Sequence, residues 1–292
     1  MLTRSISSVV VVIVGLLPLV LGGPVFAVLM AALSIAAYHE YLSIGNRVLK
    51  TQTSRVAYPG YLIIALFALA GLRSAENPIL FALSLAAFVA PFLVALVGGG
   101  IPGSAASWAF STAGTLYLGL PAFAAVSLRT FGGDLTSNWL SEFSSRAAVA
   151  WEAAPRGLAW ALLVVLATWL GDSAALLVGR SLGRHKLAPR LSPNKTVEGS
   201  IGGLVAAITA GMLVATVFGL GSIWIGGAAG AVVGIAGQSG DLCESLLKRQ
   251  AGVKDSGALI PGHGGMLDRI DALLFAFPAG YLFASLTDAW LK

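Results

Sequence analysis

Residues 157–179 read GLAWALLVVLATWLGDSAALLVG, and this stretch decides what kind of fold the chain can adopt. It is apolar over more than the roughly 20 residues that an α-helix needs to cross the hydrocarbon core of a bilayer. In lipid the backbone must satisfy its own hydrogen bonds, so only helices and closed barrels span a membrane. The stretch shows no alternation of apolar and polar residues, and the sequence therefore predicts a transmembrane helix.

Other apolar stretches of similar length predict an all-α, polytopic integral membrane protein. Hydrophobic residues make up 57% of the 292 residues and charged residues only 11%, which excludes an ordinary soluble domain. We expect a single membrane domain over residues 1–292. Its N-terminal spans and an external interfacial helix occupy 5–156, and its catalytic spans and cytoplasmic loops occupy 157–292. The nine predicted spans are 5–22, 24–44, 57–73, 78–98, 105–128, 157–179, 200–219, 222–240 and 269–288.

The distribution of Lys and Arg among the connecting loops predicts the orientation. With nine spans, 13 of the 18 Lys and Arg residues lie on the side that holds the N-terminus. The positive-inside rule places that side in the cytoplasm. The positive net charge does not indicate nucleic-acid binding, because no basic patch interleaved with aromatic residues appears. On the external side, Trp139, Phe143 and Trp151 recur at helical spacing within 129–156 and predict a helix that lies in the membrane interface.

A dense polar run lies between the last two predicted spans, over residues 241–271. Asp241 and Glu244 are three residues apart at the end of one span, and Asp268 and Asp271 have the same spacing at the start of the next. Residues three apart share a helix face, so two helix ends present paired carboxylates to one loop. Carboxylate oxygens are the usual protein ligands of Mg²⁺, so we expect Mg²⁺ to bind here. Capping of the last helix is the alternative role for Asp268 and Asp271.

The same run carries cations and glycines that suit a phosphate-bearing ligand. Lys248, Arg249 and Lys254 lie within seven positions, and Arg269 follows in the last predicted span. Arginine can bond two phosphate oxygens at once, and lysine supplies a compact charge. Glycines flank His263 and allow backbone N–H groups to approach a phosphate closely. A proton donor, a phosphate contact and an ordinary loop position are the alternatives for His263. The P-loop pattern G-x-x-x-x-G-K-[ST] is absent, which excludes that mode of nucleotide binding.

Two upstream features add further candidates. Asp172 lies inside the apolar stretch 157–179, where an ionisable residue is expected to face a polar cavity or a charged partner. The cytoplasmic loop that follows supplies cations for such a pairing, and Ser192 or Thr196 is a candidate cap for the next helix. Residues 199–240 are rich in Gly and Ala, and small residues let helices approach closely.

The spacing S-x-L-K-R, four residues, K-D, then P-x-H-G-G-x-x-D-R-x-D over residues 245–271 resembles the signature of the phosphatidate cytidylyltransferases, also called CDP-diacylglycerol synthases. Residues 192–199 (SPNKTVEG) and 237–242 (GQSGDL) resemble other blocks of that family. The resemblance implies an enzyme of the bacterial inner membrane whose active site faces the cytoplasm. It also implies the reaction of CTP with phosphatidate to give CDP-diacylglycerol and pyrophosphate.

The resemblance assigns roles to the candidate residues. It implies Asp241, Lys248, Asp268 and Asp271 as catalytic residues, with Mg²⁺ held by the three aspartates. It further implies a second cation and a homodimer. A CTP-dependent polyprenol or dolichol kinase and a secondary transporter are the alternatives. The residues implied in substrate binding are Asp172, Ser192, Lys195, Thr196, Glu198, Glu244, Arg249, Lys254, Asp255, His263, Gly264, Gly265 and Arg269.

Overall fold

The computed structural model describes most of the chain, and most of what it describes is helical. Seven of the described helices are long and apolar enough to cross a membrane. Each of them overlaps one of the predicted spans, so the prediction of an all-α, polytopic membrane protein is confirmed at this level. The residues that the structure describes are 15–50, 54–73, 77–97, 103–132, 135, 139, 142–143, 146, 155–259 and 264–291.

Two predicted spans are not among these seven helices. Most of the predicted span 5–22 lies outside the described residues. The predicted span 222–240, apart from its first residue, lies within helix α9 (Ile223–Gln250). This helix is rich in glycine and ends in charged residues, and it is therefore less apolar than the other long helices. The total of nine spans and the cytoplasmic position of the N-terminus stay predictions.

Internal contacts divide the molecule into two compact units, and each unit combines segments that are far apart in the sequence. The polar run at 241–271 contributes to both units. Unit 1 is formed by the described residues of Met1–Pro18, Gly23–Ser127 and Leu247–Ile270. Unit 2 is formed by the described residues of Leu19–Gly22, Leu128–Leu246 and Asp271–Lys292.

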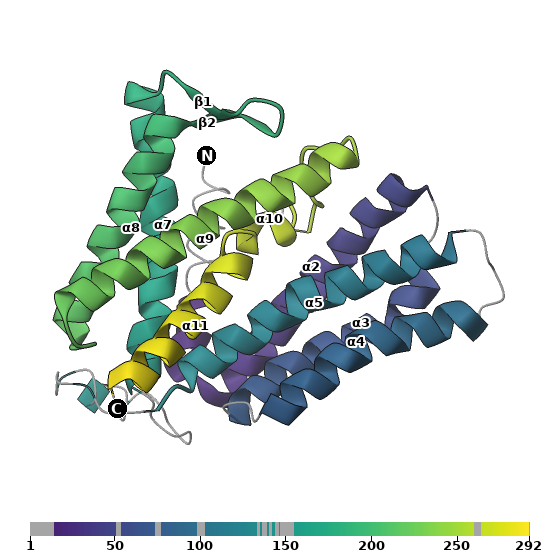
Figure 1. The fold of residues 1–292 in the computed structure, drawn as a ribbon, viewed down its shortest axis with the longest axis horizontal. Helices are drawn as coiled ribbons and strands as arrows, with labels where there is room; N and C mark the ends of the chain where they lie inside the picture. The colour runs from purple at the N-terminus through teal and green to yellow at the C-terminus, as the bar shows by residue number, and fades with distance from the viewer. Residues whose placement is uncertain are drawn as a thin grey trace. The chain divides into compact units, whose positions relative to one another are not determined.

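The helices of unit 1 pack against one another through aromatic side chains. Its elements are α2 (Gly23–Leu49), α3 (Ser54–Ala70), η1 (Gly71–Arg73), α4 (Asn77–Val97), most of α5 (Ser104–Arg129) and α10 (Leu267–Ile270) (Figure 1). The ring of Tyr41 on α2 stacks on Phe110 of α5, with the ring centroids 4.3 Å apart. The buried Tyr38 hydroxyl donates to the carbonyl of Ala57 at 3.3 Å, so its polar group is satisfied inside an apolar region.

Unit 2 contains two antiparallel helices, α7 and α8, joined by a short β-hairpin (Figure 1). Its elements are α7 (Pro155–Leu182), β1 (Lys186–Ala188), β2 (Ser192–Thr196), α8 (Val197–Phe218), most of α9 and α11 (Leu273–Leu291). The strands pair Lys186 with Thr196 and Ala188 with Ser192. The sequence analysis did not predict this hairpin, because its strands are short and polar. Pro193 is tolerated because both strands of a two-stranded sheet are edge strands.

The glycines of α8 and α9 allow the helices of unit 2 to pack closely. A Cβ atom on Gly203 of α8 would lie 2.8 Å from the carbonyl oxygen of Gly171 on α7. A Cβ atom on Gly211 of α8 would overlap the backbone of Gly226 on α9. The prediction that the small residues of 199–240 permit close helix approach is therefore confirmed.

Of the predicted external helix, the structure describes Trp139, Glu142, Phe143 and Arg146, and all of these residues are helical. The indole nitrogen of Trp139 donates to the carbonyl of Val217 at 3.1 Å. The other residues of this predicted helix, Trp151 among them, lie outside the described residues. The location of this helix in the membrane interface stays a prediction.

Candidate active site

Asp268 in α10 of unit 1 is enclosed by hydrogen-bond donors. The ammonium nitrogen of Lys248 lies 2.6 Å from Oδ1 of Asp268, and these two side chains are only 13% and 9% exposed. The backbone N–H groups of Gly265 and Ser256 donate to Oδ2 at 2.8 and 2.9 Å. Gly264 has a φ of 86°, a left-handed conformation that glycine adopts readily. Asp268 therefore pairs with the predicted catalytic lysine and also fastens the loop that precedes it.

A second buried carboxylate, Glu40 of α2, contacts the same part of unit 1. Its Oε1 accepts the backbone N–H of Met266 at 2.9 Å, and its Oε2 accepts that of Leu267 at 2.9 Å. The hydroxyl of Ser256 lies 2.8 Å from Oε2. The sequence analysis gave Glu40 no role in the site. Its position inside the predicted span 24–44 was a usable signal, since ionisable residues in such spans usually have a function.

The remaining candidates of the polar run differ in their exposure. Arg249, Lys254, Asp255 and Arg269 of unit 1 are exposed, so their charges face the surroundings. Glu244 of unit 2 is fully buried. His263 lies outside the described residues. The predicted contacts of these residues with substrate phosphates stay predictions.

Unit 2 brings a lysine and two aspartates together from three different elements. The ammonium nitrogen of Lys195 on β2 lies 2.5 Å from Oδ2 of Asp241 on α9. Asp172 on α7 interacts electrostatically with both of these residues, since Lys195 attracts its carboxylate and Asp241 repels it. A cation of the loop after α7 thus lies near Asp172, but the ion pair of Lys195 is with Asp241, so a direct partner for Asp172 stays a prediction. The side chains of Lys195 and Asp241 remain 28% and 32% exposed.

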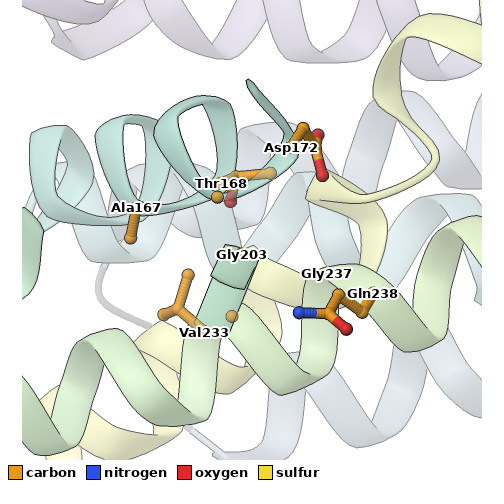
Figure 2. Close-up of a pocket in the computed structure, with 9 residues that line it drawn as sticks. Ala167, Thr168, Asp172, Gly203, Val233, Gly237 and Gln238 are labelled. Carbon is orange, nitrogen blue, oxygen red and sulfur yellow. The ribbon is translucent and has the colours of Figure 1, made fainter. Parts of the chain in front are cut away.

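A small cavity adjoins Asp172. Figure 2 shows Thr168 and Asp172 of α7 across this cavity from Val233 and Gln238 of α9. Its volume of about 10 Å³ is room for roughly one water molecule and is far too small for a nucleotide. The amide of Gln238 exchanges hydrogen bonds with Ser200 of α8, which fixes the polar wall of the cavity.

The candidates in the 192–199 loop have structural partners within unit 2. Thr196 is the N-cap of α8, and its hydroxyl accepts the backbone N–H of Gly199 at 3.1 Å. Glu198 accepts the backbone N–H of Arg184 at 3.1 Å and pairs with the His185 ring at 2.6 Å. Ser192 lies in β2 opposite Ala188. Of the two expected caps, the structure thus selects Thr196, and substrate contacts of these residues stay predictions.

Asp271 lies beside α9 in unit 2. A Cβ atom on Gly240 would lie 2.5 Å from the backbone oxygen of Asp271, so the absence of a side chain at Gly240 permits this contact. Gly240 directly precedes Asp241, and the chain segments that carry Asp241 and Asp271 are therefore adjacent. The Asp271 carboxylate accepts the backbone N–H of Ala272 at 2.7 Å.

The donor atoms of unit 2 suit a magnesium ion by their chemistry. Asp172 and Asp241 offer carboxylate oxygens in one region, and Mg²⁺ is typically bound by one or two carboxylates together with substrate phosphate and water. In the part of the chain that the structure describes, no three His, Cys, Asp or Glu side chains are gathered closely enough to hold a metal ion. Joint coordination by Asp241, Asp268 and Asp271 stays a prediction.

Comparison with known proteins identifies the family. The model of the cytidylyltransferase family matches residues 2–287. The chain belongs to this family. One similar protein, the phosphatidate cytidylyltransferase of Brucella melitensis biotype 1, is 34% identical over 289 residues, which cover 97% of this chain and 93% of the relative. The phosphatidate cytidylyltransferase of Staphylococcus haemolyticus is 48% identical over 124 residues, which cover 42% of this chain and 47% of that protein. The resemblance found in the sequence is thereby confirmed.

In this cytidylyltransferase, each unit pairs a lysine with an aspartate. Such a pair holds the lysine in place and offsets its charge. An incoming phosphate group competes with the aspartate for the lysine, and an incoming cation competes with the lysine for the aspartate. The arrangement can therefore exchange internal ion pairs for contacts with an anionic substrate and its counter-ion.

Proposed function

We propose that this cytidylyltransferase converts CTP and phosphatidate into CDP-diacylglycerol and pyrophosphate. The similarity to phosphatidate cytidylyltransferases over almost the entire chain supports this choice of substrates. A phosphate oxygen of phosphatidate attacks the α-phosphorus of CTP, and the bond from that phosphorus to the departing pyrophosphate breaks. Both reactants are anionic, so the reaction depends mainly on neutralising charge and on in-line alignment.

In our proposal the basic residues neutralise the negative charge of the two substrates. Lys195 and Lys248 are each held by an aspartate, and they are therefore oriented before the substrate arrives. The exposed Arg249, Lys254 and Arg269 attract the triphosphate and the departing pyrophosphate. The acyl chains of phosphatidate remain in the bilayer, since seven described helices have the length and composition to cross it.

We further propose that Asp241, Asp268 and Asp271 hold Mg²⁺. When bound, the ion would offset negative charge on the phosphate oxygens. The partial exposure of Asp241 and the adjacency of the segments carrying Asp241 and Asp271 support this assignment. Titration of Mg²⁺ into EDTA-treated protein, followed by the thermal unfolding midpoint with and without CTP, tests binding without relying on turnover.

The reaction is tested with purified full-length protein, phosphatidate and Mg²⁺ in detergent micelles. CTP labelled at the α-phosphate should transfer its label to the lipid, with release of unlabelled pyrophosphate. CTP labelled at the γ-phosphate should leave the lipid unlabelled and label the pyrophosphate. A polyprenol kinase would leave phosphatidate unlabelled; in a parallel assay with a polyprenol it would transfer the γ-label to that lipid and release CDP. A transporter would give neither labelled lipid nor pyrophosphate.

We also propose that the site faces the cytoplasm of a bacterial inner membrane, where CTP is available. The charge asymmetry of the loops supports this orientation. The chain has a single cysteine, so Cys243→Ala gives a cysteine-free background. Arg184→Cys in that background should react with a membrane-impermeant maleimide in inverted vesicles and not in intact spheroplasts. Arg73→Cys should show the reverse.

Light scattering of the detergent-solubilised protein would test the homodimer that the resemblance implies.

A further inference from the structure

We propose that Glu40 is a positioning residue for cytidylyl transfer. It holds the Asp268 loop, defined here as Ser256, Gly257 and residues 264–268, in the shape that orients Asp268 and Lys248. This inference rests on the proposed function, because it concerns the same reaction. All residues that it involves belong to unit 1.

Glu40 contacts the Asp268 loop at two separate points in the sequence. The backbone N–H groups of Met266 and Leu267, in the 264–268 segment, donate to its two carboxylate oxygens, each at 2.9 Å. The hydroxyl of Ser256, in the other segment of the loop, lies 2.8 Å from Oε2. The side chain of Glu40 comes from α2 and the residue is only 6% exposed, so the loop closes around a buried acceptor.

Ser256 links Glu40 to Asp268. Its hydroxyl oxygen lies 2.8 Å from Oε2 of Glu40 and 2.9 Å from Oδ2 of Asp268. Its backbone N–H donates to the same oxygen of Asp268 at 2.9 Å. Asp268 in turn pairs with Lys248 at 2.6 Å. A displacement of Glu40 is therefore transmitted through one serine to the aspartate and lysine that we assign to the reaction.

The glycines of the loop provide the space that Glu40 occupies. A Cβ atom on Gly265 would overlap both the Glu40 carboxylate and the Ser256 hydroxyl. A Cβ atom on Gly257 would also overlap the Glu40 carboxylate. Neither glycine has a positive φ, so the need for space rather than backbone conformation explains glycine at these positions. The loop is thus shaped around the carboxylate of Glu40.

The chemistry of the contact calls for a carboxylate rather than an amide. An ionised carboxylate offers only acceptor oxygens, which matches three donors around Glu40. In Glu40→Gln the side chain keeps its size, but one oxygen becomes an NH₂ group. That group then faces a backbone N–H or a hydroxyl, and at least one buried donor loses its acceptor.

The inference is tested with Glu40→Gln in the full-length enzyme, with Glu142→Gln as the matched control at an exposed glutamate. We expect kcat to fall about 10- to 100-fold in Glu40→Gln, as is typical when the support of a catalytic group is lost. Glu142→Gln should keep kcat within about two-fold of the wild type. Ser256→Ala should lower kcat as well, and the double variant should lose much less than the product of the two single losses, because both residues act through Asp268.

A second measurement reports on Lys248 without using turnover. Lys248 is 13% exposed in its pair with Asp268, and we expect slow acetylation of this residue by an amine-reactive reagent. In Glu40→Gln, acetylation of Lys248 measured by mass spectrometry should rise several-fold, while exposed Lys254 should react at the wild-type rate. Unchanged Lys248 reactivity, or unchanged kcat in folded Glu40→Gln, would overturn the role of Glu40. Absence of CDP-diacylglycerol with the wild-type protein would instead overturn the proposed function.

Discussion

The two lysine–aspartate pairs of this protein differ in how fully the protein encloses them. In unit 1, Lys248 and Asp268 are 13% and 9% exposed, and backbone N–H groups also donate to the aspartate. In unit 2, Lys195 and Asp241 are 28% and 32% exposed, and a second aspartate, Asp172, lies near enough to repel Asp241. The first pair fixes a loop in place. The second pair is better suited to give up its ion pair for contacts with a ligand, because its side chains are more exposed.

The largest expected effect is that of Asp268→Asn, which should reduce both turnover and stability. The substitution removes the negative charge of Asp268 from a mostly buried Lys248, and it turns an NH₂ group either toward that ammonium or toward the backbone N–H donors. Breaking a buried ion pair typically costs about 3 kcal/mol or more. We expect turnover to fall more than about 100-fold and the thermal unfolding midpoint to fall clearly. Near-normal turnover would remove Asp268 from the reaction and from the metal site.

The next effect is that of Asp241→Asn, which should separate turnover from stability. Because the Lys195–Asp241 pair is partly exposed, its loss should cost about 1 kcal/mol or less. Turnover should nevertheless fall about 10- to 100-fold, as expected for a residue that binds the metal ion. We would measure kcat by steady-state kinetics and the thermal unfolding midpoint on the same preparation, and compare both values with those of the wild type. A loss of stability as large as that of Asp268→Asn would contradict the distinction drawn between the two pairs.

A smaller effect is expected for Gly203→Ala. This substitution tests whether the partly exposed Lys195–Asp241 pair depends on close packing of the helices. The new methyl group would lie 2.8 Å from the Gly171 carbonyl, so α7 must move away from α8. Overpacking of this kind typically costs about 1–3 kcal/mol. Asp172 follows Gly171 directly, and we expect turnover to fall less than in Asp241→Asn. Gly132→Ala is the control, because a Cβ atom at that position would meet nothing within 4 Å.

The smallest effect is expected for Arg73→Ala. This exposed residue ends η1 and is predicted to lie on the external side. Exposed substitutions typically change stability by less than about 0.5 kcal/mol, and we expect activity to stay near that of the wild type. Transfer of label from α-labelled CTP to the lipid measures this activity. A large loss of activity would indicate that the predicted orientation is inverted.

The sequence predicts the features that depend on local composition. Long apolar stretches predicted the helices, and the glycines of 199–240 predicted close packing, because both follow from the residues of a single segment. The sequence placed a cation near Asp172, because the basic loop 183–196 directly follows the helix that carries this aspartate. Thr196 could be named as a candidate cap because it directly precedes the next apolar stretch.

Features that depend on distant segments could not be predicted in this way. Glu40 meets Ser256 across 216 positions, and nothing local to α2 specifies that contact. The β1–β2 hairpin escaped prediction because isolated short hairpins are marginally stable and carry weak sequence signals. The partners of Glu198 could not be foreseen either, since its hydrogen bonds to Arg184 and His185 depend on how that hairpin turns.

The contact of Glu40 also sets an order of events during biosynthesis. Met266 and Leu267 lie 226 and 227 positions beyond it, so a ribosome must complete most of the 292-residue chain before they can meet. Contacts of such high sequence separation form late, after the entropy of closing a long loop has been overcome. A nascent or truncated chain that lacks these residues therefore carries an unmatched acid in an apolar helix.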